Sequence, residues 1–497
     1  MGGQAGPRPM GDILTALAAE DPARPAITCD GRTTTRAELE ARANRLARSY
    51  AELGVGHGDF VTVALPNGIE FYEACYAIWK LGAVPQPASA RLPGPELGRL
   101  LALADPALVV GVAAGDADGR ASVPAGFEPD PALSDAPLES RISPSWKAPT
   151  SGGSTGESKL IVSGSTGAPD LVPIAARYRL HPGQTQLVPG PLYHNAPLIV
   201  SVTGSALGQH LVVLPRFDAQ AALDAIARHR VSFVNLVPTM MARMLRVLDT
   251  LPNVYDLSSL EIIWHMGAPC PAWLKKRWID LVGADRLYEM YGATEAVALT
   301  TISGQDWLAH PGSVGRPILG EMKVVDLDGN PAAPGQNGEI VMRRSPGSLP
   351  AYHYIGAEAR VYDDGWESLG DIGRFDEDGY LYLADRDVDM VLVGGANVYP
   401  AEVEAVIMEH PAVLSCAVVG LPDDDLGQRL HAVVQADGEL SEAALRAFAA
   451  DRLVRYKVPR SFRFVSEPLR DDAGKVRRSA VRRVEITLAG APMARPA

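Results

Sequence analysis

One ten-residue segment combines the groups that bind phosphate. Residues 150–159, TSGGSTGESK, hold three glycines, several hydroxyl side chains and, at the end, Lys159. Glycines let backbone N–H groups converge on an anion, while hydroxyl groups and a lysine add donors and positive charge. We predict a loop that holds a triphosphate. Its residues are Thr150, Ser151, Gly152, Gly153, Ser154, Thr155, Gly156 and Lys159.

The composition of this segment is also typical of a flexible Gly/Ser linker, and a second run, SGSTG at 163–167, favours that alternative. The strand-like LIVSG that follows Lys159 instead indicates a turn held by a sheet. No Walker motif and no GxGxxG fingerprint is present, so kinase and dehydrogenase functions lose their main support.

Two more segments carry oxygen ligands. YGATE at 291–295 places an aromatic ring, a hydroxyl and a carboxylate within five residues, and Mg²⁺ prefers such oxygen ligands. Taken alone, YGATE is more typical of a turn before a capped helix. Asp371 lies in a strand-like segment, where its carboxylate could accept hydrogen bonds from two sugar hydroxyls at once; the alternative is a solvated turn acid.

Composition limits the class of protein. The 497 residues predict two or three domains, and 47% apolar with 21% charged residues argues against disorder. A net charge of −13 disfavours nucleic acid as a partner. Four scattered cysteines suggest neither a zinc site nor a disulfide framework, and fit a cytoplasmic location. The longest apolar stretches are too broken for a membrane span, so we expect no membrane partner.

Periodicity predicts an α/β fold. An amphipathic helix spans Leu39 to Leu53, and strands are expected in DFVTVALP, HLVVLP and VSFVNLVP, with a helix in FYEACYAIWKLG. Farther on, turns such as LDGNP and DEDG join strand pairs into antiparallel hairpins. From about residue 388, a helix, a buried strand and a second helix predict a compact module.

The motif order resembles a known superfamily. After TSGGSTGESK come YGATE, ESLGDIGRFDEDGYLYLADRD at 367–387, GGANVYPAEVE at 394–404 and AGKVRRSAVR at 473–482. This series resembles the adenylate-forming superfamily of acyl-CoA synthetases, peptide-synthetase adenylation domains and luciferase-like enzymes. Within it, the chain looks like ligases of bulky polycyclic acids, such as bile-acid and diterpenoid ligases.

The resemblance implies a large N-terminal domain (1–386) of layered sheets and helices with a β-barrel-like portion, and a small, mobile α+β C-terminal domain (387–497) hinged near 386–389. It implies ATP, Mg²⁺ and CoA as ligands. Catalytic roles fall to Lys475, Thr294, Glu295 and His194, and Glu295 also holds the metal. ATP would further contact Gly267, Ala268, Pro269, Glu289, Met290, Tyr291, Gly292, Asp371 and Arg386.

CoA would approach past Gly394 and Gly395, and the acyl pocket would include Tyr193, Asn195, Pro238, Trp264 and His265. From residue type alone, Lys475 is one of several basic residues on a solvated helix and His194 is a structural histidine. Only the resemblance gives them catalytic roles.

The chain departs from the family at the hinge, where Val388 replaces the usual Asp or Lys, and near Lys475, where LRDDAGK adds acidic residues. The expected function is an acyl-CoA ligase for a hydrophobic, polycyclic carboxylic acid. Alternatives are an aryl or medium-chain acid, a carrier protein in place of CoA, and a nucleotide-binding regulator without catalysis. A homodimer is the default for a soluble enzyme.

Overall fold

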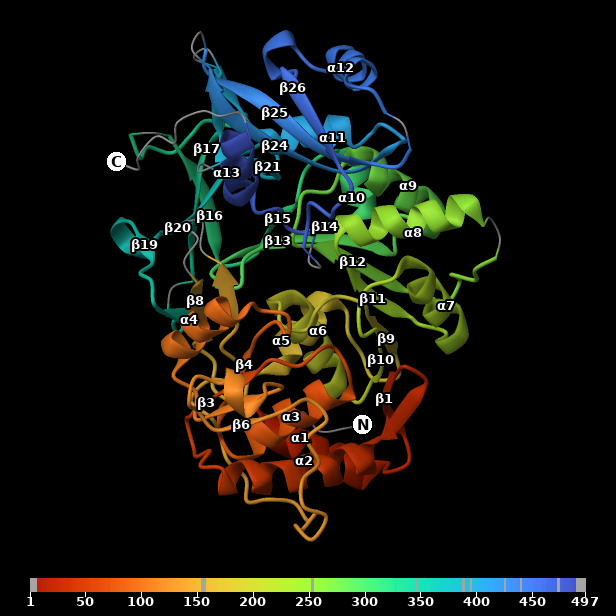
Figure 1. Cartoon of the computed structure of the whole chain (residues 1–497), viewed down its shortest axis with the longest axis vertical. Helices are drawn as coiled ribbons and strands as arrows, with labels where there is room; N and C mark the ends of the chain where they lie inside the picture. The colour runs from red at the N-terminus through yellow and green to blue at the C-terminus, as the bar shows by residue number, and fades with distance from the viewer. Residues whose placement is uncertain are drawn as a thin grey trace.

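The computed structural model describes residues 7–152, 158–251, 254–326, 328–345, 347–386, 389–393, 396–423, 426–438, 440–471 and 474–488. The N-terminal helices and the C-terminal unit lie at opposite ends of the long axis of the molecule (Figure 1). Within these ranges, none of the helices combines the length and apolar character needed to cross a membrane.

Three helices build the N-terminal end: α1 (Met10–Glu20), α2 (Arg36–Glu52) and α3 (Ile69–Lys80). The predicted helix over 39–53 is confirmed as α2. It begins after Thr35, whose hydroxyl accepts from the Glu38 backbone N–H while the Glu38 carboxylate accepts from the Thr35 backbone. This reciprocal cap satisfies two N–H groups that a helix start leaves unpaired. The buried faces of these helices form the largest apolar core.

A nine-stranded sheet runs through the middle of the chain, in the order β15-β14-β13-β12-β11-β9-β10-β1-β2. Its strands are β1 (Pro25–Cys29), β2 (Arg32–Thr35), β9 (Thr185–Val188), β10 (His210–Val213), β11 (Phe233–Leu236), β12 (Ile262–Met266), β13 (Leu287–Gly292), β14 (Leu299–Ser303) and β15 (Arg316–Leu319). The six strands from β13 to β1 in this order are parallel. Their carboxyl ends therefore meet at one edge.

Helices connect the parallel strands β9, β10, β11, β12 and β13, as expected for parallel pairs. They are α6 (Asn195–Ala206), α7 (Ala219–His229), α8 (Pro238–Thr250) and α9 (Ala272–Val282). Two further helices are α5 (Leu171–Tyr178), which precedes β9, and α10 (Gly304–Ala309), which lies between the antiparallel strands β14 and β15. The predicted strands in HLVVLP and VSFVNLVP are confirmed as β10 and β11.

Two smaller sheets flank the phosphate-loop motif. A parallel sheet joins β4 (Val84–Pro87), β3 (Phe60–Val63), β5 (Leu108–Val110) and β6 (Ser122–Val123), with α4 (Gly94–Ala104) beside it. An antiparallel sheet joins β18 (Tyr352–Ile355), β8 (Ser158–Ser163) and β7 (Thr150–Gly152). The backbone of Ser151 pairs with that of Lys159, so both ends of the segment belong to paired strands and the linker alternative is wrong. Residues 153–157 between them lie outside the described residues.

The predicted hairpins lie in a five-stranded antiparallel sheet of β16 (Glu321–Val325), β17 (Gly338–Arg343), β19 (Arg360–Val361), β20 (Glu367–Phe375) and β21 (Leu381–Arg386). Over the described ranges this sheet and the β18-β8-β7 sheet stay separate, because no ladder of backbone pairs joins them. The predicted barrel-like portion corresponds to these two antiparallel sheets.

The C-terminal unit has a mixed sheet and its own apolar core. Its elements are β22 (Val391–Val393), β23 (Ala396–Val398), α11 (Pro400–Ile407), β24 (Val413–Asp423), β25 (Gly427–Ala436), α12 (Glu442–Ala450), β26 (Ser461–Val465) and α13 (Arg478–Leu488). The predicted helix–strand–helix series is confirmed as α11, β24 and α12. Val388 of the predicted hinge lies outside the described residues.

Candidate active site

Several predicted site residues come after strands at one edge of the nine-stranded sheet. His194 follows β9, Pro238 follows β11, Gly267 follows β12 and Glu295 follows β13. These four strands are neighbours in the sheet, and their carboxyl ends point the same way. Ligands of open α/β sheets bind at this edge, because loops from adjacent strands converge there.

Lys159 and Glu295 lie together although they are far apart in the sequence. The Lys159 Nζ atom is 3.4 Å from Glu295 Oε1 and lies over the Tyr354 ring, 3.7 Å from its centroid. The Tyr354 hydroxyl donates to the same carboxylate oxygen at 2.6 Å. Burial and the Glu295 charge raise the pKa of Tyr354. The predicted phosphate lysine and the predicted metal ligand thus share one polar cluster.

The donor set at Glu295 fits a magnesium ion carried by a nucleotide. Its carboxylate is 6% exposed and no group of three or more His, Cys, Asp or Glu side chains suited to a metal exists among the described residues. Mg²⁺ is commonly bound by one or two carboxylates plus substrate phosphates and water. One buried carboxylate beside a phosphate-loop lysine is consistent with that arrangement.

Tyr291 and Asp371 come from different sheets and meet at the site. The Tyr291 hydroxyl donates to Asp371 Oδ2 at 2.7 Å, and Asp371 on β20 pairs through its backbone with Arg386 on β21. Strand β14 follows the YGATE turn closely, so the alternative of a turn before a helix is wrong. On the phosphate segment, Thr150 accepts from Gln86 Nε2 at 2.8 Å.

Several predicted residues cannot be placed in full. Gly153, Ser154, Thr155, Gly156, Gly394 and Gly395 lie outside the described residues, as do the side chains of Ser151 and Arg386. Thr294 lies in the turn after β13, and Gly267, Ala268 and Pro269 lie in the loop between β12 and α9. Gly267 has a φ of 85°, which glycine adopts without strain.

His194 is the N-cap residue of α6 and lies beside Tyr193, with 4.4 Å between ring centroids. Its Nε2 atom is buried and has no hydrogen-bond partner among the described residues. Burial first, and the nearby charge of Lys475 second, lower the pKa of His194 to about 4. The imidazole is therefore neutral at pH 7, and this nitrogen can bond to a ligand.

Lys147 is a buried cation that sequence reasoning missed. Its side chain is 5% exposed, and Nζ donates to the neutral Oδ1 of Asn195 at 2.7 Å. Burial lowers the pKa of Lys147 to about 8, while the charge of Glu295 raises it. A buried ammonium is costly without a carboxylate partner, so such a residue is a candidate for function. The available signal is a lone charged residue in the stretch ISPSWKAP before Thr150.

The loop of Lys475 is seated against the large part of the chain. A Cβ atom built on Gly474 would be 2.7 Å from Thr239 Oγ1 and 3.3 Å from a Val237 methyl group. Asp471 Oδ1 accepts from the Lys475 backbone N–H at 2.9 Å, so this acidic neighbour shapes the turn. Together with the effect of the Lys475 charge on His194, these contacts bring the predicted catalytic lysine to the carboxyl edge of the sheet.

The predicted acyl pocket needs a correction. Trp264 and His265 are consecutive on β12, so their side chains point to opposite faces of the sheet. Trp264 packs between Tyr178 and Tyr288, whereas His265 lies 3.9 Å from Glu289 Oε2. Both side chains are fully buried, and they cannot both line one cavity.

Two predicted nucleotide contacts also use their side chains elsewhere. Glu289 forms a buried ion pair with Lys275 at 2.6 Å, and Met290 packs in an apolar core. Contacts from these two positions to a nucleotide would have to come from the backbone.

Comparison with known proteins agrees with these observations. The family profile described as AMP-binding enzyme matches residues 14–353, and its C-terminal domain matches residues 402–475. The chain is 33% identical to 2-succinylbenzoate–CoA ligase of Geobacillus kaustophilus, with 93% of this chain and 95% of that protein covered. It is 34% identical to feruloyl-CoA synthase of Amycolatopsis, with 92% and 95% covered.

Among solved structures, the o-succinylbenzoate CoA synthetase of Bacillus subtilis in complex with its acyl-adenylate intermediate is similar, with a TM-score of 0.80 and 25% identity. The match covers 96% of this chain and 98% of that one.

Proposed function

The chain belongs to the AMP-binding enzyme family, and from this premise we propose that it is an ATP-dependent ligase that joins a carboxylic acid to CoA through an acyl-adenylate. In the first step, a carboxylate oxygen attacks the α-phosphorus and pyrophosphate leaves. In the second step, the CoA thiol attacks the acyl carbonyl, the thiol proton passes to solvent, and AMP leaves.

The observation that carries this proposal is the position of Lys475. Its loop is seated against Val237 and Thr239, and its charge acts on His194 at the carboxyl edge of the sheet. An ammonium here neutralises charge that would otherwise repel the carboxylate from the phosphate. Phosphoryl-type displacements depend mainly on such positioning and charge neutralisation.

The other predicted residues each bind a different part of the nucleotide. Lys159 contributes a cation for the phosphates, Tyr291 an aromatic face for the base, and Asp371 an acceptor for the ribose hydroxyls. Glu295 would hold the Mg²⁺, which polarises the phosphate oxygens when bound. The Tyr354 hydroxyl fixes the orientation of this carboxylate.

The second step requires Lys475 to leave. We propose that the C-terminal unit rotates near residues 386–389 and that Gly394 and Gly395 then border the path of the pantetheine arm. Val388 offers no side-chain hydrogen bond at this pivot, so the two orientations would be balanced by other contacts. We propose a cytoplasmic enzyme, because ATP and CoA are its substrates and its four cysteines are unpaired.

For the acid, we propose a hydrophobic and polycyclic carboxylate, with an aryl or medium-chain acid as the second candidate. Tyr193 and the mostly apolar residues that follow β9 and β11 support a hydrophobic acyl group. The relatives named above act on succinylbenzoate and ferulate, which favours acids with a ring.

Isotope exchange between pyrophosphate and ATP tests the first step. We expect exchange only with an added acid, with the highest rate for a steroid or diterpenoid acid in a panel that also contains aryl and fatty acids. AMP release that depends on CoA, compared with release on addition of a carrier protein, tests the acceptor. Absence of exchange with every acid would favour the nucleotide-binding regulator.

A further inference from the structure

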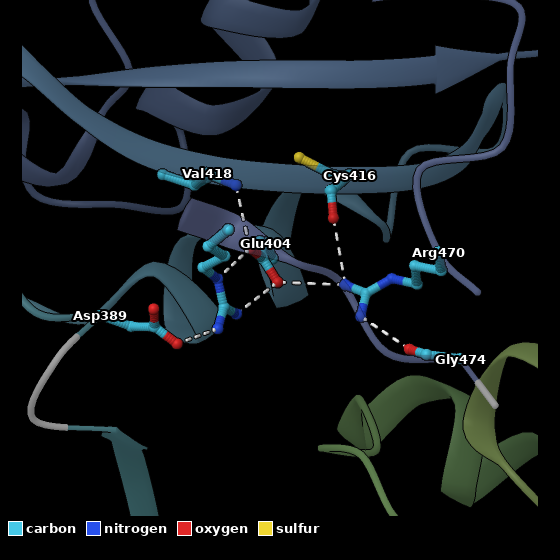
Figure 2. Close-up of polar contacts among 7 residues, drawn as sticks. Asp389, Glu404, Cys416, Val418, Arg470 and Gly474 are labelled. Atoms are coloured by element: carbon cyan, nitrogen blue, oxygen red, sulfur yellow. Dashed lines mark hydrogen bonds and ion pairs between the residues drawn. The ribbon is translucent and has the colours of Figure 1, made fainter. Parts of the chain in front are cut away.

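Arg470 connects the loop of Lys475 to the body of the C-terminal unit. Its Nη1 donates to the carbonyl of Gly474, the residue before Lys475, at 3.1 Å. Its Nη2 donates to Glu404 Oε2 and to the carbonyl of Cys416, both at 3.1 Å (Figure 2). The Arg470 side chain is 11% exposed, so solvent does little to replace these bonds. One guanidinium therefore fixes the backbone that carries the lysine.

Glu404 on α11 holds Arg470 in place. Its carboxylate is 3% exposed and is surrounded by donors. Oε1 accepts from the Val418 backbone N–H at 2.9 Å and from Arg478 Nε at 3.0 Å. Oε2 accepts from Arg478 Nη2 at 3.0 Å and from Arg470. Four hydrogen bonds hold this buried carboxylate in one orientation, because turning it would break charge-assisted bonds that solvent cannot replace.

The same network reaches the predicted hinge. Arg478 Nη1 donates to Oδ2 of Asp389, which is the first described residue after the pivot segment. The charged contacts are continuous: they run from Asp389 to Arg478, then to Glu404, then to Arg470, and end at the Gly474 carbonyl. The start of the C-terminal unit and the loop of Lys475 are held as one body.

The close contact of Gly474 with Thr239 makes the position of the Lys475 loop critical. Thr239 Oγ1 would be 2.7 Å from a Cβ atom on Gly474, so the loop packs there without spare room. A shift of a few tenths of an ångström would move Lys475 relative to His194 and the carboxyl edge. Misplacement of a catalytic group by about 1 Å can cost about a hundredfold in rate.

We propose that Arg470, held by Glu404 and Arg478, is a positioning residue that sets the Lys475 loop for adenylation and moves it together with the hinge. This rests on the proposed function. Arg470 contacts no reacting group and acts through the Gly474 carbonyl. Since Lys475 is needed only in the first step, loss of this bond affects acyl-adenylate formation and spares thioester formation.

The test measures the two half-reactions separately in the full-length chain. Arg470→Gln and Arg470→Lys are compared with the unaltered protein for acid-dependent pyrophosphate–ATP exchange, and for thioester formation from supplied acyl-adenylate and CoA. The acid is the one that gives the fastest exchange in the unaltered protein. We expect kcat of the exchange to fall about tenfold or more in Arg470→Gln, with KM for ATP little changed and the thioester step within about twofold.

Arg470→Lys keeps the charge but loses the planar fork that reaches Glu404, Cys416 and Gly474 together, so we expect a smaller fall in the exchange alone. It also serves if Arg470→Gln folds poorly. The control is Arg446→Gln on α12, an arginine that donates to two backbone carbonyls of the same unit and is not a member of the network. It should leave the ratio of the two rates unchanged.

An equal fall in both half-reactions in Arg470→Lys, or an unchanged exchange rate in Arg470→Gln, would overturn the positioning role alone. If the unaltered protein shows no exchange with any acid, the proposed function fails, and this role fails with it.

Discussion

The Tyr291 hydroxyl donates a hydrogen bond to Asp371 Oδ2 across 2.7 Å, joining the nine-stranded sheet to the five-stranded sheet. The bond orients the carboxylate proposed to hold the ribose. Tyr291→Phe keeps the aromatic face and removes this bond, which involves a charged acceptor. Such bonds contribute about 1.5–3 kcal/mol, so we expect KM for ATP to rise about tenfold or more. An unchanged KM would assign the pair to structure only.

Lys475→Ala removes the proposed cation of the first step. We expect pyrophosphate–ATP exchange to be lost while supplied acyl-adenylate is still converted to the CoA thioester. The two half-reactions are followed separately, by labelled ATP and by thioester chromatography. Equal loss of both would contradict a lysine that serves one step and then withdraws. Arg477→Ala, two residues farther on in an exposed position, is the control.

Lys147→Met tests the buried cation beside Asn195. If its ammonium attracts the carboxylate of the acid, KM for the acid should rise about tenfold, as expected for loss of one charge-assisted bond. The free energy of unfolding should change little, because the variant removes the cost of a desolvated charge while leaving one amide oxygen unpartnered.

A second buried lysine supplies a matched control. Lys80 is 2.8 Å from Glu40 Oε2 and is as buried as Lys147, but it lies at the N-terminal end. Lys80→Met strands a buried carboxylate and should lower the free energy of unfolding by about 3–5 kcal/mol without raising KM for the acid. Similar stability losses in both variants, with KM unchanged, would make Lys147 a structural residue.

His265 predicts a dependence of stability on pH. Burial lowers the pKa of His265 to about 4, below its ordinary value of 6.5. Between these values the unfolded chain binds a proton that the folded chain does not, so stability falls as the pH drops through this window. His265→Gln should make the fall between pH 6.5 and 4 less steep. Urea unfolding at pH 7, 5.5 and 4.5 measures the slope.

His353→Gln, at an exposed position, is the control for that series. A slope as steep in His265→Gln as in the unaltered protein would mean that this imidazole does not contribute to acid destabilisation.

The local patterns predicted the elements well. The period of Leu39 to Leu53 predicted one helix, and the strand after Lys159 predicted a turn held by a sheet. The closeness of Lys159 and Glu295 could be inferred only through the resemblance, since it depends on how β8 and β13 come together. The contact of Tyr354 with Glu295 was harder still to predict, because the alternation of a strand does not show which residues its side chains face.

The errors have physical reasons. The pocket prediction placed Trp264 and His265 side by side, although neighbours on a strand face opposite ways. Arg470 and Glu404 could not be paired from their spacing, because a basic residue in a polar loop is usually solvated. Only its bonds to Glu404 on α11 and Cys416 on β24 show that this arginine is buried.

His194, Pro238, Gly267 and Glu295 follow four neighbouring strands whose side chains already pack in separate apolar cores. The recognition of a new acid could therefore evolve by exchange of short connecting segments while the sheet below keeps its packing. Such an arrangement lets one scaffold diversify its chemistry with little penalty in foldability.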